Sequence, residues 1–465
     1  MKLKRVMIAA PGSGSGKTTI TCALLQTLKK MGLQVVSYKC GPDYIDPMFH
    51  ENVLGIPSQN LDTFFTDEEE TKTLFMKNRT EDDFAVVEGV MGIFDGLGGT
   101  REEGSSYHLA KVTKTPIILV VDAKGMGRSV IPLIAGFLAY DKECLIKGVI
   151  LNRMSKSCYE IVRVLIEEEL NICVVGYFED RRQFHIESRH LGLMIPSELN
   201  HIKTLLDAVS EEFQKTVSVG SIMQIAERAE ELEFEAVQVM PAHVRGSTHK
   251  NSPVIAVARD EAFCFYYEDN LALLRECGAD IEYFSPIHDK TLPDGCSGLL
   301  IGGGYPELCA EALSSNTGML KRIKAAFEMG MPMVAECGGF MYLHSAIIDK
   351  EGNSYAMVGA IPAVCYDAGK LVRFGYIELE ENQSCFLPKG ERIKGHEFHY
   401  FDSQNNGCDC LATKPATGKS YACVMVGENY WIGFPHLYYP SNPSFAKRFI
   451  EKAEVYKKGA GKLYG

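Results

Sequence analysis

Residues 10–19 read APGSGSGKTT and directly follow a short apolar run, and this junction constrains the fold more than any other segment. Its alternating glycines let the backbone turn tightly with amide groups pointing inward, and those amides attract phosphate together with the start of a helix. Lys17 would reach the outer phosphates of a nucleotide, and the hydroxyl of Thr18 would bind a magnesium ion. The segment therefore predicts a strand, a phosphate-binding loop and a helix in succession.

The loop departs at Pro11 from the usual pattern G-x-x-x-x-G-K-[ST], which has glycine at that position. Proline lacks an N–H, but this position precedes the amides that form the cradle, so no phosphate contact is lost. The alternative is a Gly/Ser connection that merely joins a strand to a helix. Because G-K-T-T follows an apolar strand directly, we interpret the segment as a variant nucleotide-binding loop.

Short apolar runs alternate with helical patterns over residues 1–200. The runs are VMIAA, LQVVSYK, FAVVEG, PIILVVD, KGVILN and ICVVGY. Continuous apolar runs separated by helices predict a parallel sheet that is covered on both faces. Two amphipathic helices should follow, one with an apolar face at Leu205, Leu206, Val209 and Phe213 and one with a face at Ile222, Ile225, Ala229 and Leu232.

A second α/β series follows residues 240–253, which are rich in Pro, Gly, Ser and Thr and are interpreted as an interdomain linker. The series starts at PVIAVA, continues with GLLIGGGYPE and PMVAECGGFMYL, and gives way after Gly352 to shorter strands such as RFGYIELE. We therefore expect a domain at 1–200, a helical connection and linker at 201–251, and a second α/β domain at 252–457.

Length and composition narrow the function. A chain of 465 residues is too long to fold around a single hydrophobic core. Its net charge of −12 argues against general nucleic-acid binding, and no apolar stretch approaches the ~20 residues of a membrane span. The 15 cysteines are scattered without a pair of C-x-x-C motifs, so we expect a cytoplasmic, reducing setting, no zinc site, no nucleic-acid partner and no membrane partner.

Carboxylates follow the predicted strands of the first domain. Glu88 ends the buried run FAVVEG, where a nucleotide loop protein would have its second metal-side acid, although a strand-end carboxylate can also be a simple cap. The loop KCGPDYIDP carries Lys39, Asp43 and Asp46, and MGIFDG carries Asp95. Ligands bind at the carboxyl edge of open α/β sheets, so these acids are candidates for a magnesium–nucleotide site.

The second domain has the pattern of a cysteine nucleophile. Cys337 in MVAECGGF lies between an apolar strand and a helix, a sharp turn that exposes a nucleophile, and the helix start is expected to lower its pKa. His436 in IGFPHLYYPSNP is a candidate base. The glycines of LIGGGYPE (residues 302–304) offer amides for an oxyanion. Each residue alone could be structural, but the combination favours catalysis.

Eight motifs now stand in order: APGSGSGKTT, KCGPDYIDP, VVEGVMGIFDG, GGGYPE, AECGGFMYL, RFGY, GHEFHY and HLYYPSNP. Together they resemble the cobyrinic acid a,c-diamide synthase family, glutamine-dependent amidotransferases of corrin biosynthesis, over nearly the whole chain. The resemblance implies a dethiobiotin-synthetase-like P-loop domain fused to a class I-type glutaminase domain. It also implies ATP- and glutamine-dependent amidation of the a and c acetate side chains of cobyrinic acid, a corrin-type tetrapyrrole polyacid.

The resemblance assigns roles to matching positions. It implies ATP contacts from the loop and one strand end: Gly14, Gly16, Lys17, Thr18, Thr19 and Asn152. It implies a Mg²⁺ and phosphoryl centre at Thr18, Asp43, Asp46 and Glu88. Asp95 would assist amidation, and Tyr44 and Ile45 would lie near the corrin carboxylates. Cys337 and His436 would release ammonia from L-glutamine, with oxyanion amides at Gly303, Gly304 and Gly338.

Three questions stay open in the sequence. Class I triads usually end in H-x-E, but here Tyr438 stands two residues after His436, so another group must orient the histidine. The polyacid substrate needs local cations, and Arg181, Arg182 and Arg189 are candidates unless they form a solvated face. The assembly, with a homodimer as one candidate, is not given by the sequence.

Other functions fit part of the pattern. Nickel-sirohydrochlorin and hydrogenobyrinic acid a,c-diamide synthases would keep the chemistry and change the macrocycle. A P-loop switch ATPase of the partitioning type would cycle on a partner, but its usual second loop lysine would fall at Gly12, and it needs no glutaminase half. A regulator with a vestigial glutaminase domain is a third alternative, against which Cys337 and His436 both speak.

Overall fold

The computed structural model describes residues 2–181, 184, 196–235 and 252–460. The chain divides into two compact units, Met1–Val237 and Gln238–Gly465, and each is described by itself. Most of the predicted linker, residues 240–251, lies outside the described residues. Within the described residues, no helix combines the length and the apolar character that crossing a membrane requires.

The first unit is built on a parallel sheet of seven strands in the order β3-β2-β4-β1-β5-β6-β7. The strands are β1 (Lys4–Ala9), β2 (Gln34–Cys40), β3 (Ser58–Leu61), β4 (Asp83–Glu88), β5 (Ile117–Asp122), β6 (Ile146–Asn152) and β7 (Cys173–Phe178). All six predicted runs form strands, as expected for apolar segments buried on both faces. β3 was missed because its sequence, SQNL, is polar, and its strand conformation depends on pairing with β2 at the sheet edge.

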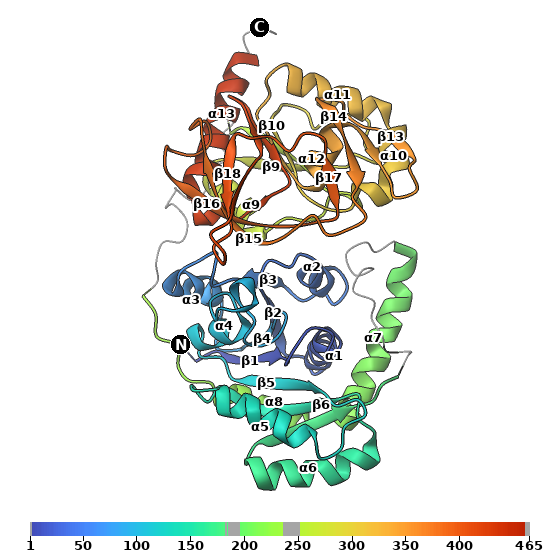
Figure 1. Cartoon of the computed structure of the whole chain (residues 1–465), viewed down its shortest axis with the longest axis vertical. Helices are drawn as coiled ribbons and strands as arrows, with labels where there is room; N and C mark the ends of the chain where they lie inside the picture. The colour runs from blue at the N-terminus through green and yellow to red at the C-terminus, as the bar shows by residue number, and fades with distance from the viewer. Residues whose placement is uncertain (1, 182–183, 185–195, 236–251, 461–465) are drawn as a thin grey trace. The chain divides into compact units, whose positions relative to one another are not determined.

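Helices cover both faces of this sheet. They are α1 (Lys17–Lys30), α2 (Ile45–Asn52), α3 (Glu68–Met76), α4 (Ser106–Val112), α5 (Val130–Tyr140), α6 (Lys156–Leu170), α7 (Pro196–Thr216) and α8 (Val219–Glu227), with a short 3-10 turn η1 (Leu97–Gly99). α7 runs beside α1 (Figure 1) and buries Leu206, Val209 and Phe213 in the same core as α1. Both predicted amphipathic helices therefore complete the first unit.

The second predicted amphipathic helix is shorter than expected. α8 ends at Glu227, so Ala229 and Leu232, predicted on its apolar face, follow the helix instead. Both side chains are nevertheless buried. The apolar spacing was therefore a correct guide to burial but not to the helix end.

The second unit contains a six-stranded sheet in the order β20-β21-β11-β10-β8-β9, in which all pairs are parallel except β20 with β21. Its strands are β8 (Val254–Ala258), β9 (Asp280–Phe284), β10 (Cys296–Ile301), β11 (Met333–Glu336), β20 (Met425–Val426) and β21 (Tyr430–Gly433). The helices of this unit are α9 (Glu268–Glu276), α10 (Ala310–Ser315), α11 (Thr317–Glu328), α12 (Gly338–Leu343) and α13 (Pro443–Ala460), with 3-10 turns η4 (Pro306–Cys309) and η5 (Tyr439–Ser441).

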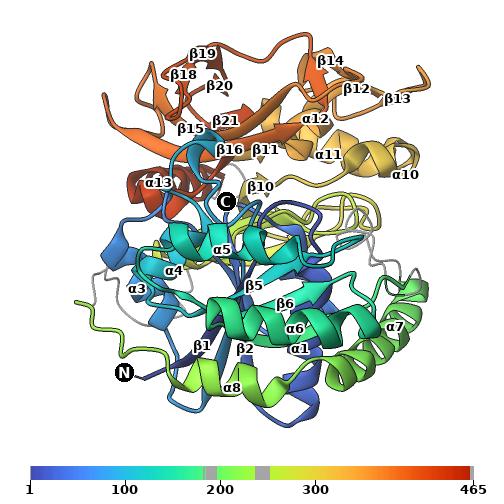
Figure 2. The same ribbon diagram turned by 60° about the horizontal axis from the view of Figure 1, so that its bottom comes forward.

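Two smaller sheets follow in sequence, as the Gly-punctuated pattern after Gly352 predicts. One joins β12 (His344–Ile348), β13 (Ser354–Ala356), β14 (Ile361–Asp367) and β17 (Phe401–Ser403). The other joins β15 (Arg373–Glu381), β16 (Arg392–His399), β18 (Cys410–Thr413), β19 (Ser420–Cys423) and β22 (His436–Leu437). β15 and β16 form a long antiparallel pair, which can be followed in Figure 2.

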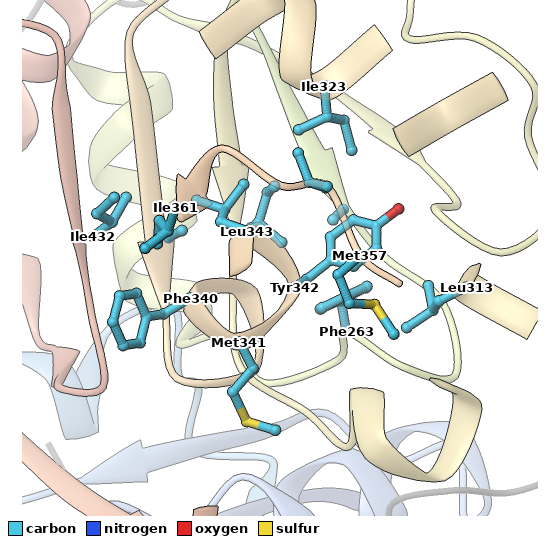
Figure 3. Close-up of a cluster of buried hydrophobic side chains, with 14 of the residues drawn as sticks. Phe263, Leu313, Ile323, Phe340, Met341, Tyr342, Leu343, Met357, Ile361 and Ile432 are labelled. Atoms are coloured by element: carbon cyan, nitrogen blue, oxygen red, sulfur yellow. The ribbon is translucent and has the colours of Figure 1, made fainter. Parts of the chain in front are cut away.

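The core of the second unit surrounds α12. Phe340, Met341, Tyr342 and Leu343 are all buried, and Figure 3 shows them among apolar side chains from other elements, Phe263 and Ile432 included. Burial on all sides fixes both the position and the rotation of this short helix. It therefore fixes Cys337, the residue immediately before the helix.

Candidate active sites

The glycine loop of the first unit is open at two of its glycines. Gly14 and Gly16 have φ angles of 74° and 90°, a region that favours glycine. A Cβ built on Gly12 or Gly14 would meet no atom within 4 Å. Lys17 Nζ donates to the carbonyls of Gly12, at 3.1 Å, and Met91, at 2.6 Å. Burial, followed by the nearby charge of Lys39, lowers the pKa of Lys17 to about 8.

A buried group of charges lies directly behind the loop. Thr18, one residue before the half-exposed Thr19, donates its hydroxyl to Glu88 Oε1 at 2.7 Å. Lys39 Nζ lies 3.0 Å from the same oxygen and also pairs with Asp46. Burial, followed by the charge of Asp46, raises the pKa of Glu88 to about 8. Burial also pushes the pKa of Asp46 upward, but the Lys39 ammonium outweighs it and lowers that pKa.

The loop after β2 brings its acids to this group. Asp43 Oδ1 accepts N–H bonds from Ile45, at 2.8 Å, and Asp46, at 3.3 Å, which orders the start of α2. Its other oxygen lies 3.8 Å from Lys39 Nζ. Ile45 is half-buried and the neighbouring Tyr44 is buried. Sequence reasoning therefore predicted the gathering of Asp43, Asp46 and Glu88 at one sheet edge.

Asp95 lies in the loop after β4, which packs against the phosphate loop. Asp95 Oδ2 accepts the N–H of Gly92 at 3.0 Å, and Ile93 N donates to the carbonyl of Ala10 at 2.8 Å. A Cβ on Gly92 would lie 2.7 Å from the carbonyl oxygen of Pro11. Pro11 thus belongs to a tight contact between two loops, and Asp95 is close enough to raise the pKa of Lys17 through its charge.

Asn152, at the end of β6, is tied to the phosphate loop. Its Nδ2 donates to the carbonyl of Ser15 at 2.8 Å, and a Cβ on Gly16 would lie 2.2 Å from that nitrogen. Arg153, which sequence reasoning missed, pairs with Asp122 and reaches the carbonyl of Gly14 at 3.4 Å. The motif ILNR, which places Arg153 directly after the end of β6, was the signal that could have revealed it.

Two further residues near the acids were also missed. His50 lies on α2 one turn after Asp46. Its Nδ1 forms a hydrogen bond of 2.8 Å with Ser37 Oγ, and its Nε2 lies 3.5 Å from Glu88 Oε2. Its i, i+4 spacing from Asp46 was the available signal. Asn60, in the polar strand β3, donates to the carbonyls of Gly41 and Asp43 at 2.8 and 2.7 Å and so braces the acidic loop.

The first site fits a magnesium–nucleotide complex. Glu88 Oε2 is buried and accepts no hydrogen bond from the described residues. Within those residues no group of three or more His, Cys, Asp or Glu side chains is arranged to hold a metal unaided. Magnesium usually keeps several waters and binds through one or two carboxylates and substrate phosphates. Thr18 and Glu88 beside an open phosphate loop therefore suit magnesium better than a metal that requires a full protein cage.

Cys337 occupies a strained turn between β11 and α12. Its φ and ψ angles are 48° and −104°, an uncommon conformation for a residue with a Cβ. Cys337 N donates to the carbonyl of Gly433 at 2.8 Å, because β11 pairs with β21. His436 starts β22 three residues after Gly433, so strand pairing brings the cysteine and histidine segments to the same end of the sheet. Both side chains are buried.

The expectation that the helix start lowers the Cys337 pKa is wrong. Burial, followed by the charge of Glu307, raises the pKa of this thiol well above its usual value. α12 has only six residues, and the Gly338 N–H that donates to the sulfur does not outweigh burial. Burial, followed by His396 and His399, lowers the pKa of His436 well below its usual value. At rest the thiol and the imidazole are therefore both neutral.

The predicted oxyanion glycines pack against these residues. A Cβ on Gly303 would lie 2.3 Å from His436 Cε1, and a Cβ on Gly338 would lie 3.1 Å from the amide nitrogen of Gly304. Gly302, the first glycine of the loop, is engaged elsewhere, because its N–H donates to the Tyr266 hydroxyl at 2.9 Å. The structure thus gathers Gly303, Gly304 and Gly338 beside His436.

The GHEFHY motif, to which the sequence alone assigned no role, forms one wall of this site. His396 stacks on His436 with ring centroids 4.9 Å apart, and His399 stacks on Phe434 at 4.0 Å. Glu397, which follows His396 in the sequence, is buried and accepts from Arg373, at 3.4 Å, and from Tyr421. Sequence reasoning also missed Glu336, the residue before Cys337, whose Oε2 lies 4.0 Å from His436 Nδ1.

Of the three candidate cations for a polyacid, Arg181 belongs to the described part of the chain, and it is engaged in ion pairs. Arg181 pairs with Glu179 at 3.0 Å and with Glu212 at 2.8 Å, so it belongs to a surface ion-pair group. Arg182 and Arg189 lie outside the described residues.

All fifteen cysteines have free thiols.

Comparison with known proteins matches both units. Residues 6–191 match the family model described as the CobQ/CobB/MinD/ParA nucleotide binding domain, and residues 254–428 match the CobB/CobQ-like glutamine amidotransferase domain. Among curated relatives, the cobyrinate a,c-diamide synthase of Caldanaerobacter subterraneus is 39% identical over 97% of this chain and 98% of its own. The cobyrinate a,c-diamide synthase of Thermoplasma volcanium is 38% identical over 98% of this chain and 99% of its own. That of Listeria innocua is 36% identical over 99% of this chain and 100% of its own.

Proposed function

We propose that this chain, which belongs to the cobyrinate a,c-diamide synthases, amidates the a and c acetate carboxylates of cobyrinic acid. The members of this family are glutamine-dependent amide-forming ligases. The observation that carries the proposal is the presence, on one chain, of an open phosphate loop backed by Glu88 and of Cys337 in a strained turn beside His436. A single nucleotide switch would use only the first of these.

The first unit would activate the carboxylate. A carboxylate is a poor electrophile at neutral pH, and transfer of the γ-phosphoryl group of ATP onto it gives an acyl phosphate with a good leaving group. Lys17, released from its two carbonyl partners, would hold the phosphates, and Asn152 would support the loop and contact the adenine. Thr18 and Glu88 would bind Mg²⁺, with Asp43 and Asp46 at the same metal and phosphoryl centre, and the ion would neutralise phosphate charge when bound. Asp95 would assist the displacement of phosphate by ammonia.

The second unit would supply that ammonia. Cys337 would pass its proton to His436 and attack the carboxamide carbon of L-glutamine, and amides of Gly303, Gly304 and Gly338 would stabilise the oxyanion. The C–N bond then breaks, His436 returns the proton to the leaving ammonia, and water hydrolyses the glutamyl thioester. Enzymatic release is needed because free ammonia is mostly protonated in the cell and is then not nucleophilic.

The functional division follows the sequence. We assign the ATP-dependent step to residues 1–200 and the glutaminase step to 252–457, with 201–251 as the helical connection. Tyr44 and Ile45, at the start of α2, are our candidates for contact with the corrin carboxylates. We place the enzyme in the cytoplasm, with no nucleic-acid or membrane partner, and a homodimer as a candidate assembly.

An assay with three macrocycles tests the proposal. Purified protein is given ATP, Mg²⁺, glutamine and either cobyrinic acid, nickel-sirohydrochlorin or hydrogenobyrinic acid, and products are identified by mass. We expect two amidations of cobyrinic acid and little turnover of the others. Faster amidation of another macrocycle would change the substrate assignment. ATP hydrolysis without amidation of any of the three would favour a switch ATPase instead.

A further inference from the structure

The group that orients His436 is missing from its usual place in the sequence, two residues after the histidine. The structure offers a different acid. Glu336, the residue before Cys337, has Oε2 4.0 Å from His436 Nδ1, an ion-pair distance once the imidazole is protonated. The nitrogen that faces this acid is Nδ1, and in the proposed mechanism Nε2 is the nitrogen that receives the proton of Cys337. We infer that Glu336 is the positioning residue of His436, an inference that rests on the proposed glutaminase role of the site.

Glu336 is held by the segment that carries His436. Tyr439 donates its hydroxyl to Glu336 Oε1 at 3.2 Å, and the N–H of Leu437 donates to the same carboxyl group. Both donors come from the three residues that follow His436. On its other side, Glu336 stands opposite Gly433 in the β11–β21 register. The acid is therefore fixed relative to the imidazole by strand pairing on one side and by two hydrogen bonds on the other.

This arrangement suits transfer of the cysteine proton. When the Cys337 proton moves to His436 Nε2, the imidazole becomes a cation whose Nδ1–H faces Glu336. Burial raises the pKa of Glu336 to about 8, and the neighbouring cation would favour its ionised form. The charge is otherwise poorly compensated, because His396 and His399 also lower the pKa of His436. Glu336 thus ties thiolate formation at Cys337 to the state of His436.

Besides the hydroxyls of Tyr439 and Tyr266, whose pKa values burial and the charge of Glu336 raise, the acids and histidines that act on the pair come from three elements. They are Glu336 from β11, His396, Glu397 and His399 from β16, and Glu307 from η4, whose charge acts on Cys337. Glu397 raises the pKa of His436 through its charge, but it is already engaged by Arg373 and Tyr421. Glu307 acts on the sulfur in the opposite sense, because it disfavours the thiolate.

Alkylation of Cys337 measures this role directly. The full-length protein is treated with iodoacetamide from pH 6 to 10, and modification of the Cys337 peptide is followed by mass spectrometry, with exposed Cys408 as an internal reference. In Glu336→Gln we expect Cys337 alkylation at neutral pH to fall roughly 10- to 100-fold and its midpoint to move to higher pH. Glutamine-driven amidation should fall in parallel, while ammonia-driven amidation stays unchanged.

Two further variants separate positioning from stability. Glu381→Gln removes another buried acid of the same unit, one that accepts N–H bonds from residues 385–387, and should leave Cys337 alkylation unchanged. Tyr439→Phe removes one donor from Glu336 and should lower the alkylation rate about threefold, which keeps the inference testable if Glu336→Gln does not fold.

Two results distinguish this inference from the proposed function. If both Glu336→Gln and Tyr439→Phe show the wild-type rates of Cys337 alkylation and of glutamine use, the positioning role is overturned. The proposed function stays intact in that case. A wild-type protein that produces no glutamate from glutamine would overturn the proposed function, while slower alkylation of Cys337 in Glu336→Gln would still support the positioning role.

Discussion

The two candidate sites hold charge in opposite ways. In the first unit, Lys39 pairs with Asp46 and lowers its pKa, so this buried site keeps an ion pair, with Asp43 and Glu88 beside it. In the second unit, burial leaves Cys337 and His436 neutral. The first site is thus ready to receive a charged ligand, whereas the second must separate charge before it reacts. This difference predicts a glutaminase that is slow until a proton moves from sulfur to imidazole.

The largest expected effect separates the two sites completely. Cys337→Ser removes the nucleophile, so glutamine-driven amidation should fall roughly 1000-fold or more, while amidation driven by ammonium chloride should stay near the wild-type rate. Both rates are read from product mass under matched conditions. Loss of both activities in a folded variant would contradict the division of labour between the units.

Substitutions behind the phosphate loop should stop both reactions. Lys17→Ala removes the cation at the phosphates, and Glu88→Gln removes the acid that accepts from Thr18, so each should lower both rates about 100-fold or more. Glutamine hydrolysis without ATP reports on the second site alone and should survive in these variants. A Lys17→Ala protein that still amidates with ATP would remove the loop from the mechanism.

A glycine substitution tests the packing of the second site. A Cβ on Gly303 would lie 2.3 Å from His436 Cε1, so Gly303→Ala should displace the imidazole and lower glutamine-driven amidation by roughly 10- to 50-fold. Gly318→Ala is the matched control, because its Cβ would meet nothing closer than 3.7 Å, at the start of α11. Equal glutamine-driven rates in the two variants would argue against Gly303 as part of the site.

The smallest effect concerns acid stability of the second unit. Burial lowers the pKa of His344 to about 4, so the unfolded chain binds its proton at higher pH than the folded unit does. The contribution of neutral His344 to the free energy of unfolding is fully present above pH 6.5. It is lost as the pH falls toward 4, by at most about 3 kcal/mol.

The single tryptophan, Trp431, is buried in this unit and reports its unfolding in urea. His344→Gln should be less stable than wild type at pH 7 but should lose less stability than wild type between pH 7 and pH 4.5. An identical pH dependence in the two proteins would show that His344 binds its proton equally well in the folded and unfolded states.

The sequence predicted features that depend on local pattern. The apolar runs form strands, the glycine loop forms a tight turn between β1 and α1, and Cys337 adopts a strained turn, because each follows from neighbouring residues. The predicted pKa of Cys337 was wrong in direction, since burial from all sides outweighs a six-residue helix. Local reasoning sees the helix start but not the surrounding core.

Features that depend on distant residues were missed. Glu336 meets His436 only because β11 pairs with β21, and the sequence gives no register for these strands. β3 forms because Ser58 and its neighbours pair with β2, not because SQNL favours a strand. His50 was within reach of sequence reasoning, since it lies one helical turn after Asp46, but its contact with Glu88 required the fold.

The central claim is that the phosphate bound by the first unit activates a carboxylate. It is tested by labelling the a and c carboxylates of cobyrinic acid with oxygen-18 and following the label during amidation with ATP and glutamine. If acyl phosphates form, one labelled oxygen per amide should appear in inorganic phosphate, because phosphate leaves with an oxygen of the carboxylate. Amide formation with unlabelled phosphate would contradict the account.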